Sequence, residues 1–107
     1  MSTRFAAAAI WAAAAFSPAP AGAAPRVYTV TIQNMTFSPA PAGLRIGDSV
    51  EWVNNDILRH TATAADRSFS VELAPKARAR TRLAKPGVVR FFCRFHPGMK
   101  GQLSVGK

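Results

Sequence analysis

Three side chains that could bind a metal lie close together near the end of the sequence. Cys93, His96 and Met99 follow one another at spacings of three residues. They supply a thiolate, an imidazole and a thioether, and a single loop with this spacing can bring all three donors to one point. The chain has one further histidine, His60, so these four residues form a candidate set of ligands.

This combination of donors favours copper over other metals. Soft thiolate and thioether ligands together with imidazoles select copper, and two histidines, one cysteine and a weak axial methionine are the ligands of blue-copper electron-transfer sites. Structural zinc sites use cysteine and histidine and do not recruit a thioether, so zinc is the weaker alternative. The predicted cofactor is one copper ion that cycles between Cu(I) and Cu(II). Its predicted ligands are His60, Cys93, His96 and Met99.

The first 23 residues are typical of a secretory signal peptide. A basic start that ends at Arg4 is followed by an apolar stretch over 5–16 and then by small residues up to Ala23. The apolar stretch is shorter than the ~20 residues of a membrane-spanning helix, so no stable membrane insertion is expected. We predict cleavage of a signal peptide 1–23, a mature domain of residues 24–107, and export to the periplasm.

Cys93 is the only cysteine in the chain, and export limits how it can be used. An intramolecular disulfide is impossible, and a free thiol in an oxidising compartment is a liability unless it is buried or bound to metal. A domain of this size also gains little stability from its hydrophobic core alone, and small exported domains usually add disulfides or metal. Both arguments favour a metal site.

Each candidate ligand also has a simpler interpretation. A lone cysteine is often a small core residue, a lone histidine is often structural, and methionine commonly fills gaps in a core. Cys93 and a histidine could instead form a nucleophilic thiolate pair. The sequence offers no identifiable Asn or Asp to orient that histidine and no oxyanion feature. The pattern as a whole therefore favours metal binding, and no enzymatic activity is expected.

The elements that must position these ligands are predicted to be short β-strands. β-branched and aromatic runs between turns rich in glycine and proline, with no helical period after residue 24, indicate an all-β sandwich or barrel of about seven strands. Gly47 and Asp48 predict a hairpin-like turn between strands 44–46 and 49–54. His60 is expected in the loop after the second of these strands. The other expected strands are 27–32, 69–73, 78–83, 88–93 and 101–105.

The ligand pattern resembles that of the small bacterial cupredoxins, and among them the amicyanin-like and plastocyanin-like proteins. Cys93-x-x-His96-x-x-Met99 is similar to the short amicyanin loop. The resemblance implies a Greek-key cupredoxin β-sandwich with the copper at one end, held by one histidine from an upstream loop and three ligands between the last two strands. It extends over almost the whole mature chain, through the segments 35–39, 47–54, 66–69 and 85–87.

Two departures from the family pattern lie beside the ligands. Family members often have asparagine directly after the upstream histidine, where its side chain helps to join the two ligand loops, and Thr61 has that position here. Arg94 and Phe95 lie where amicyanins tend to have threonine and proline. They place a cation beside the copper and an aromatic ring near the surface that the resemblance implies for docking.

The charge of the chain narrows the choice of partners. The formal charge is +9, and it becomes +8 after Ala23 because Arg4 is the only charged residue before that point. Such a field favours acidic proteins, anionic lipid surfaces or nucleic acid, and export makes a nucleic-acid partner unexpected. The arginines that would favour an acidic partner are Arg67, Arg78, Arg80, Arg82 and Arg90.

The function expected from these features is electron transfer. We expect a monomer that carries single electrons between a redox donor and a redox acceptor, with an acidic cytochrome or dehydrogenase as a partner. Two other classes stay open at this stage. One is a periplasmic copper carrier or sequestration protein that uses the same four ligands, and the other is a cationic interaction protein that needs no copper.

Overall fold

A computed structural model describes residues 24–107, and the predicted signal peptide lies outside the described residues. These 84 residues form eight β-strands and no helix. Within them there is accordingly no helix long and apolar enough to cross a membrane. The strands are β1 (Val27–Gln33), β2 (Thr36–Phe37), β3 (Ser49–Asn54), β4 (His60–Ala64), β5 (Ser70–Leu73), β6 (Arg78–Arg82), β7 (Gly87–Phe92) and β8 (Lys100–Val105).

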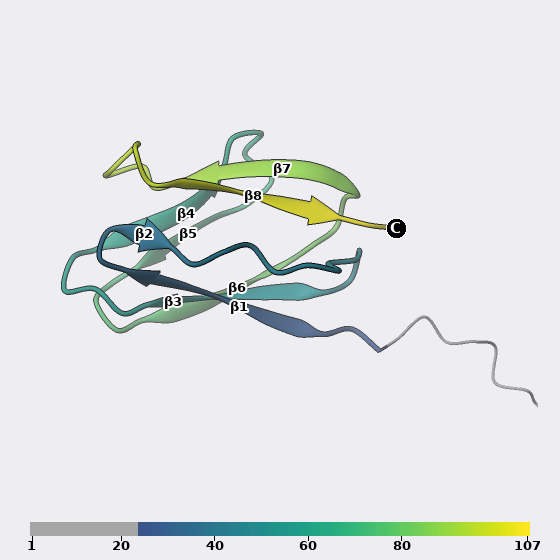
Figure 1. Cartoon of the computed structure of the whole chain (residues 1–107), viewed down its shortest axis with the longest axis horizontal. Helices are drawn as coiled ribbons and strands as arrows, with labels where there is room; N and C mark the ends of the chain where they lie inside the picture. The colour runs from purple at the N-terminus through teal and green to yellow at the C-terminus, as the bar shows by residue number, and fades with distance from the viewer. Residues whose placement is uncertain (1–23) are drawn as a thin grey trace, which may run out of the picture.

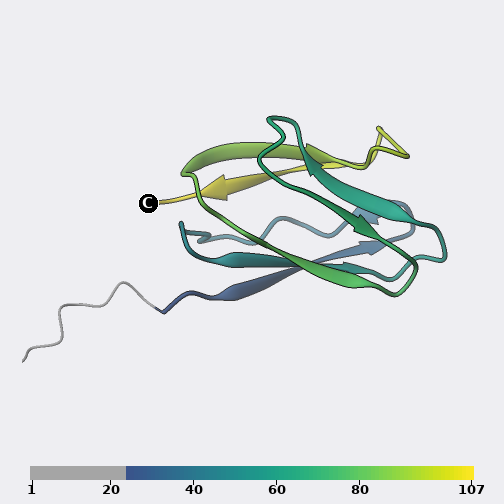
Figure 2. The ribbon, with the colours of Figure 1, turned by 180° about the vertical axis from the view of Figure 1, so that it is seen from behind.

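The strands form two four-stranded sheets that stack face to face (Figure 1, Figure 2). One sheet has the order β2-β1-β3-β6 and the other β5-β4-β7-β8. β1 and β3 pair in parallel, and all other neighbouring strands are antiparallel. The chain changes sheet after β3, β5 and β6, as in a Greek-key arrangement. The predicted all-β sandwich is therefore confirmed, with eight strands where about seven were predicted.

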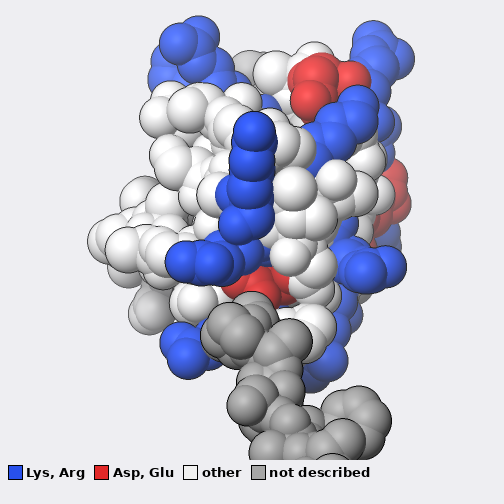
Figure 3. Space-filling model, turned by 90° about the vertical axis from the view of Figure 1, so that its right-hand side faces the viewer, with Lys and Arg blue, Asp and Glu red and all other residues white. Residues whose placement is uncertain are grey.

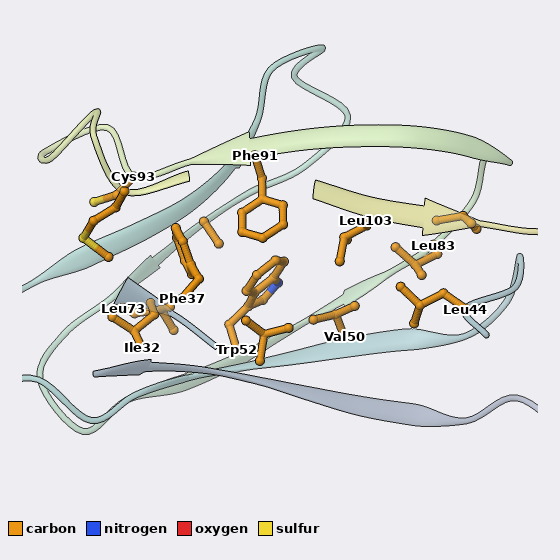
Figure 4. Packing of buried hydrophobic residues seen from close by; sticks show 14 residues of the cluster. Ile32, Phe37, Leu44, Val50, Trp52, Leu73, Leu83, Phe91, Cys93 and Leu103 are labelled. Atoms are coloured by element: carbon orange, nitrogen blue, oxygen red, sulfur yellow. The ribbon is translucent and has the colours of Figure 1, made fainter. Parts of the chain in front are cut away.

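The core between the sheets is built around Trp52 in β3. Its side chain is fully buried, and its ring centroid lies 5.0 Å from that of Phe91 and 6.1 Å from that of Phe37, both in edge-on contacts. The indole N–H donates a hydrogen bond to Oγ1 of Thr81 over 3.0 Å, so this buried donor has its partner. Figure 4 shows these rings between the sheets, with Cys93 at one end of the same cluster.

The predicted strand 44–46 is wrong. This segment makes one isolated parallel bridge, between Arg45 and Gly106, and β3 pairs with β1 and β6 instead. The carboxylate of Asp48 explains the difference, because it accepts hydrogen bonds from the backbone N–H groups of Arg26 and Arg45, each over 2.9 Å. The Asp48 side chain thus accepts backbone N–H groups that could otherwise pair with a neighbouring strand, and the segment 44–46 is a loop.

Two strands were not expected from the sequence. β2 has only two residues, and β4 covers a segment where a loop containing His60 was predicted. All five residues of β4 are buried, and β4 lies inside its sheet between β5 and β7. Its sequence, HTATA, places threonines on the side where other strands carry exposed polar residues. His60 is therefore the first residue of a central strand, which corrects the loop assignment.

Candidate metal centre

Three of the four predicted ligands lie in the short connection between β7 and β8. Cys93 directly follows β7, and Met99 directly precedes β8. The N–H of Cys93 donates to the carbonyl oxygen of Met99 over 3.0 Å, and the N–H of Met99 donates to the carbonyl oxygen of His96 over 2.8 Å. The first bond joins the two ends of the loop next to the β7–β8 ladder, and the second closes a turn within the loop.

The fourth predicted ligand, His60, reaches the same place from β4. Its side chain is fully buried, and its Nδ1 lies 3.8 Å from Sγ of Cys93, which is also fully buried. The rings of His60 and His96 have centroids 5.3 Å apart. Met99 is buried in the same cluster as Cys93, whereas His96 is partly exposed. Residues separated by more than thirty positions in the sequence are thus neighbours at one end of the sandwich.

The geometry and the donors fit a transition-metal ion. Metal–thiolate and metal–imidazole bonds are about 2.3 Å and about 2.0 Å long in zinc sites. Two such bonds together exceed the 3.8 Å between Sγ of Cys93 and Nδ1 of His60, so one ion can bond to both atoms with a bent angle. Within residues 24–107, no three His, Cys, Asp or Glu side chains lie close enough together to form a metal-binding group. The preference for copper comes from the donor types, because the predicted set includes a thioether.

Asp56 is a part of this centre that residue types and spacing did not predict, and it corrects the expectation that no Asp orients a candidate histidine. One carboxylate oxygen lies 2.7 Å from Nε2 of His60, and the carboxylate also accepts the backbone N–H groups of Asn34 and Met35 over 2.7 and 3.0 Å. The hydrogen bond from Met35 is the largest cause that holds the pKa of Asp56 below its ordinary value, and His60 and Asn34 add to it.

The bond to Asp56 selects the form of the His60 ring. A carboxylate with a lowered pKa only accepts hydrogen bonds, so Nε2 carries a proton, and in the neutral ring the free lone pair is then on Nδ1, the atom that faces Cys93. Carboxylates commonly orient metal-binding histidines in this way. The sequence shows Asp56 four residues before His60, but it does not show that the 34–35 turn lies beside both.

Thr61 joins the two segments that carry the ligands. Its backbone N–H donates to Sγ of Cys93 over 3.3 Å, and its hydroxyl oxygen accepts the N–H of Arg94 over 2.8 Å. Threonine therefore makes the connection for which the family resemblance implies asparagine.

Arg94 and Phe95 lie on the outside of the ligand loop. Arg94 pairs with Glu72 over 3.0 Å, and Glu72 also holds Arg59 at 3.4 Å. The guanidinium carbon of Arg94 lies 6.0 Å from the centre of the Phe95 ring. The cation next to Cys93 in sequence is thus compensated by a carboxylate, and the ring of Phe95 is 46% exposed.

The sequence of the chain matches a family model described as a cupredoxin-like domain, over residues 5–105. The chain belongs to the cupredoxin-like family. The match begins at residue 5, inside the segment predicted to be cleaved. Cleavage of a signal peptide after Ala23 therefore stays a prediction. A search of curated proteins finds no significant match.

Solved structures with the same fold include several amicyanin variants. The reduced state of one amicyanin mutant superposes with a TM-score of 0.64 at 21% identity, over 74% of this chain and 81% of the other. The reduced Cu(I) form of another at pH 4 gives the same TM-score at 20% identity, with the same coverage. A copper-containing nitrite reductase from Thermus scotoductus SA-01 gives 0.67 at 30% identity, over 75% of this chain but 22% of the enzyme.

Proposed function

We propose that this cupredoxin carries single electrons between redox proteins in the periplasm, as a monomer. Its cofactor is a single copper ion, and we propose His60, Cys93, His96 and Met99 as the ligands. The observation that carries the proposal is the 3.8 Å approach of two fully buried donors, the Cys93 sulfur and His60 Nδ1, beside His96 and Met99. The similarity to copper-containing amicyanins supports it.

Copper supplies the redox chemistry at this centre, since it gains and loses one electron. The residues of the chain supply a fixed set of donors. Asp56 holds the His60 ring with Nδ1 free, and Thr61 holds the Cys93 sulfur through its N–H group. Burial of Cys93, His60 and Met99 excludes water from their side of the site. A site whose donors are held this firmly needs little rearrangement when the charge of the ion changes.

The surface around the ligand loop is suited to brief contact with a partner. His96 is partly exposed. Three large apolar side chains are also exposed, one in the same loop as His96 and two in the loop that precedes β4. They are Ile57, Leu58 and Phe95, which are 86%, 47% and 46% exposed. Exposed apolar groups of this kind favour protein contact. We propose that a redox partner docks here, within reach of His96.

Visible absorption of the purified mature domain tests the proposal. One equivalent of Cu(II) should give an intense band near ~600 nm that ascorbate bleaches reversibly, because that band arises from a thiolate bound to copper. Cys93→Ser should abolish the band, whereas Met35→Leu, which changes an exposed methionine, should keep it. A colourless wild-type protein would contradict the assignment.

The same sample distinguishes an electron carrier from a copper carrier. A carrier of electrons should exchange its ion slowly with a Cu(I) chelator, since three of its four proposed ligands are buried. Rapid and complete loss of copper to the chelator would favour delivery of metal. The nitrite reductase similarity does not make the chain an enzyme, because the chain spans only 22% of that protein.

A further inference from the structure

The positive charge of the domain is unevenly compensated. The chain has five acidic residues, and two of them, Glu51 and Glu72, hold two arginines each. The three aspartates accept hydrogen bonds from backbone N–H groups. The other Lys and Arg side chains among residues 24–107 take part in no ion pair, so their positions show where positive charge is uncompensated.

Several unpaired cations lie on the outer face of the second sheet, next to the metal centre. Along β7, Phe91 points into the core, so the alternation of a strand places Arg90 and Phe92 on the opposite, outer side. Lys100 in β8 is directly opposite Phe92 in the antiparallel register, and it therefore shares this face. Arg90 and Lys100 take part in no ion pair within the described part of the chain.

Phe92 separates two hollows on this face, and each hollow contains cations. One is lined by Arg90 and Lys100 together with Phe92. The other is lined by Arg67 and Arg94 together with Phe92. The ring of Phe92 is partly exposed between them. We refer to Arg67, Arg90, Phe92, Arg94 and Lys100 as the Phe92 face.

The Phe92 face is firmly connected to the ligand cysteine. Phe92 is bonded to Cys93, and the N–H of Arg94 donates to the Thr61 hydroxyl. That hydroxyl lies 3.1 Å from the hydroxyl of Thr63, which in turn lies 2.8 Å from that of Ser70 at the edge of the second hollow. A molecule seated on this face thus contacts the segment that carries the copper ligand.

The other basic regions lack this combination. On β6, Arg78 and Arg80 are both held by Glu51, at 3.2 and 3.0 Å. Figure 3 shows further Lys and Arg side chains around the end of the sandwich that carries the C-terminus. That end is opposite the one where Cys93 lies (Figure 1, Figure 4). Among residues 24–107, only the Phe92 face joins unpaired cations to a partly exposed aromatic ring beside a proposed ligand.

We propose that the Phe92 face is a second docking surface and that it binds an acidic surface of a folded protein partner. This docking surface rests on the proposed function, and it specifies where the partner binds and that the partner's surface is acidic. Arg67, Arg90 and Lys100 supply the complementary charge, which accelerates encounter and sets orientation. Phe92 supplies an aromatic contact at the centre, a residue type that is enriched in protein interfaces. Binding to an anionic membrane would require neither the Phe92 ring at the centre of the face nor a position next to Cys93.

Nitrogen-15 NMR of the copper-loaded, ascorbate-reduced domain tests the inference, with poly-L-glutamate as the acidic probe. Amide shifts are expected to cluster at the Phe92 face. Arg67→Glu with Arg90→Glu should weaken binding about tenfold or more. The matched control is Arg82→Glu with Lys107→Glu, which removes the same charge from exposed positions near the opposite end and should change binding less than about twofold.

Two results would overturn the inference. Equal weakening by both pairs of substitutions would show that only net charge matters, and tighter binding to phosphatidylglycerol vesicles than to poly-L-glutamate would assign the face to a membrane. The absorption spectrum of the same sample reports separately on the proposed function. A sample without the blue band contradicts the copper assignment, whereas a blue sample with scattered shifts contradicts only the docking surface.

Discussion

Aspartates shape three loops of this domain at the level of single residues. Asp48, Asp56 and Asp66 each accept at least one backbone N–H group, and the pKa of each is below its ordinary value mainly because of hydrogen bonds. Asp48 acts at the end that carries the C-terminus, and Asp56 acts at the metal centre. The same chemistry therefore stabilises the fold at one end and positions a proposed ligand, His60, at the other.

Replacement of Asp56 by asparagine should weaken copper binding. Asn keeps the size of the side chain but loses the negative charge beside His60, and loss of such a carboxylate partner typically costs 10–100-fold in metal affinity. Competition with a Cu(I) chelator measures the change. Asp66→Asn is the control, because Asp66 accepts the N–H of Ser68 within its own turn. Equal copper affinity in wild type and Asp56→Asn would contradict the role assigned to Asp56.

Asp48 should make the stability of the domain sensitive to acid. Hydrogen bonds from the N–H groups of Arg26 and Arg45, in that order, lower its pKa below 3.8. A group with a lowered pKa in the folded state adds stability above its unfolded pKa, and this contribution is lost as the pH falls through the folded pKa. Asp48→Asn should therefore reduce the free energy of unfolding near neutral pH.

Urea unfolding at several pH values measures this effect. The difference between wild type and Asp48→Asn should shrink as the pH falls below 3.8. A difference that is constant over the whole range would show that the charge of the carboxylate is not its source.

At the scale of strands, the alternation of residues predicted most of the fold. It places Val30 and Ile32 inward in β1, and it places Phe91 and Cys93 inward at the end of β7, as the structure confirms. β4 was missed because both of its faces are buried, and its alternating threonines and alanines lack the large apolar residues that mark a strand.

The candidate site shows the same limit. Its donors could be proposed from residue types and spacing, since Cys93, His96 and Met99 lie within one loop. Asp56 could not, because its partners include the backbone of the 34–35 turn, and backbone donors leave no trace in residue types. Thr61 was recognised as a departure from the family, but only its contacts show that it joins the two ligand segments.

Gly101 in β8 should be required for the packing of the second sheet. A methyl group there would overlap Cζ of Phe91 and lie 3.0 and 3.1 Å from its two ε carbons. The Phe91 ring cannot move freely, because it contacts Phe37 and Trp52 at centroid distances of 4.9 and 5.0 Å. Gly101→Ala should therefore destabilise the domain by about 1–3 kcal/mol, the usual cost of overpacking.

Urea unfolding of two alanine variants checks this packing argument. Gly106→Ala is the control, because its methyl group would meet only ordinary contacts at 3.5 Å or more. Loss of stability in Gly101→Ala that does not exceed the loss in Gly106→Ala would show that the Phe91 ring adjusts to the added group.

At the scale of the whole molecule, the two ends of the sandwich are suited to different roles. Cys93 lies at one end, and both the C-terminus and the beginning of the described chain lie at the other (Figure 1, Figure 4). Residues 24–26 are exposed there and precede β1. Cleavage before Ala24 would thus take place far from the proposed ligands, so this processing need not disturb the proposed copper site.

Expression of the full chain in a bacterium with a periplasm should give a mature protein that begins at Ala24. Signal peptidases require small residues at the last and third-last positions before the cut, which are Ala23 and Ala21 here. Mass spectrometry of the periplasmic fraction measures the new N-terminus. Ala23→Phe should block cleavage at this bond, whereas Ala24→Gly, directly after it, should be cleaved normally. An uncleaved wild-type chain would contradict the predicted boundary. It would also contradict a freely diffusing electron carrier, because the domain would remain attached to the apolar segment 5–16.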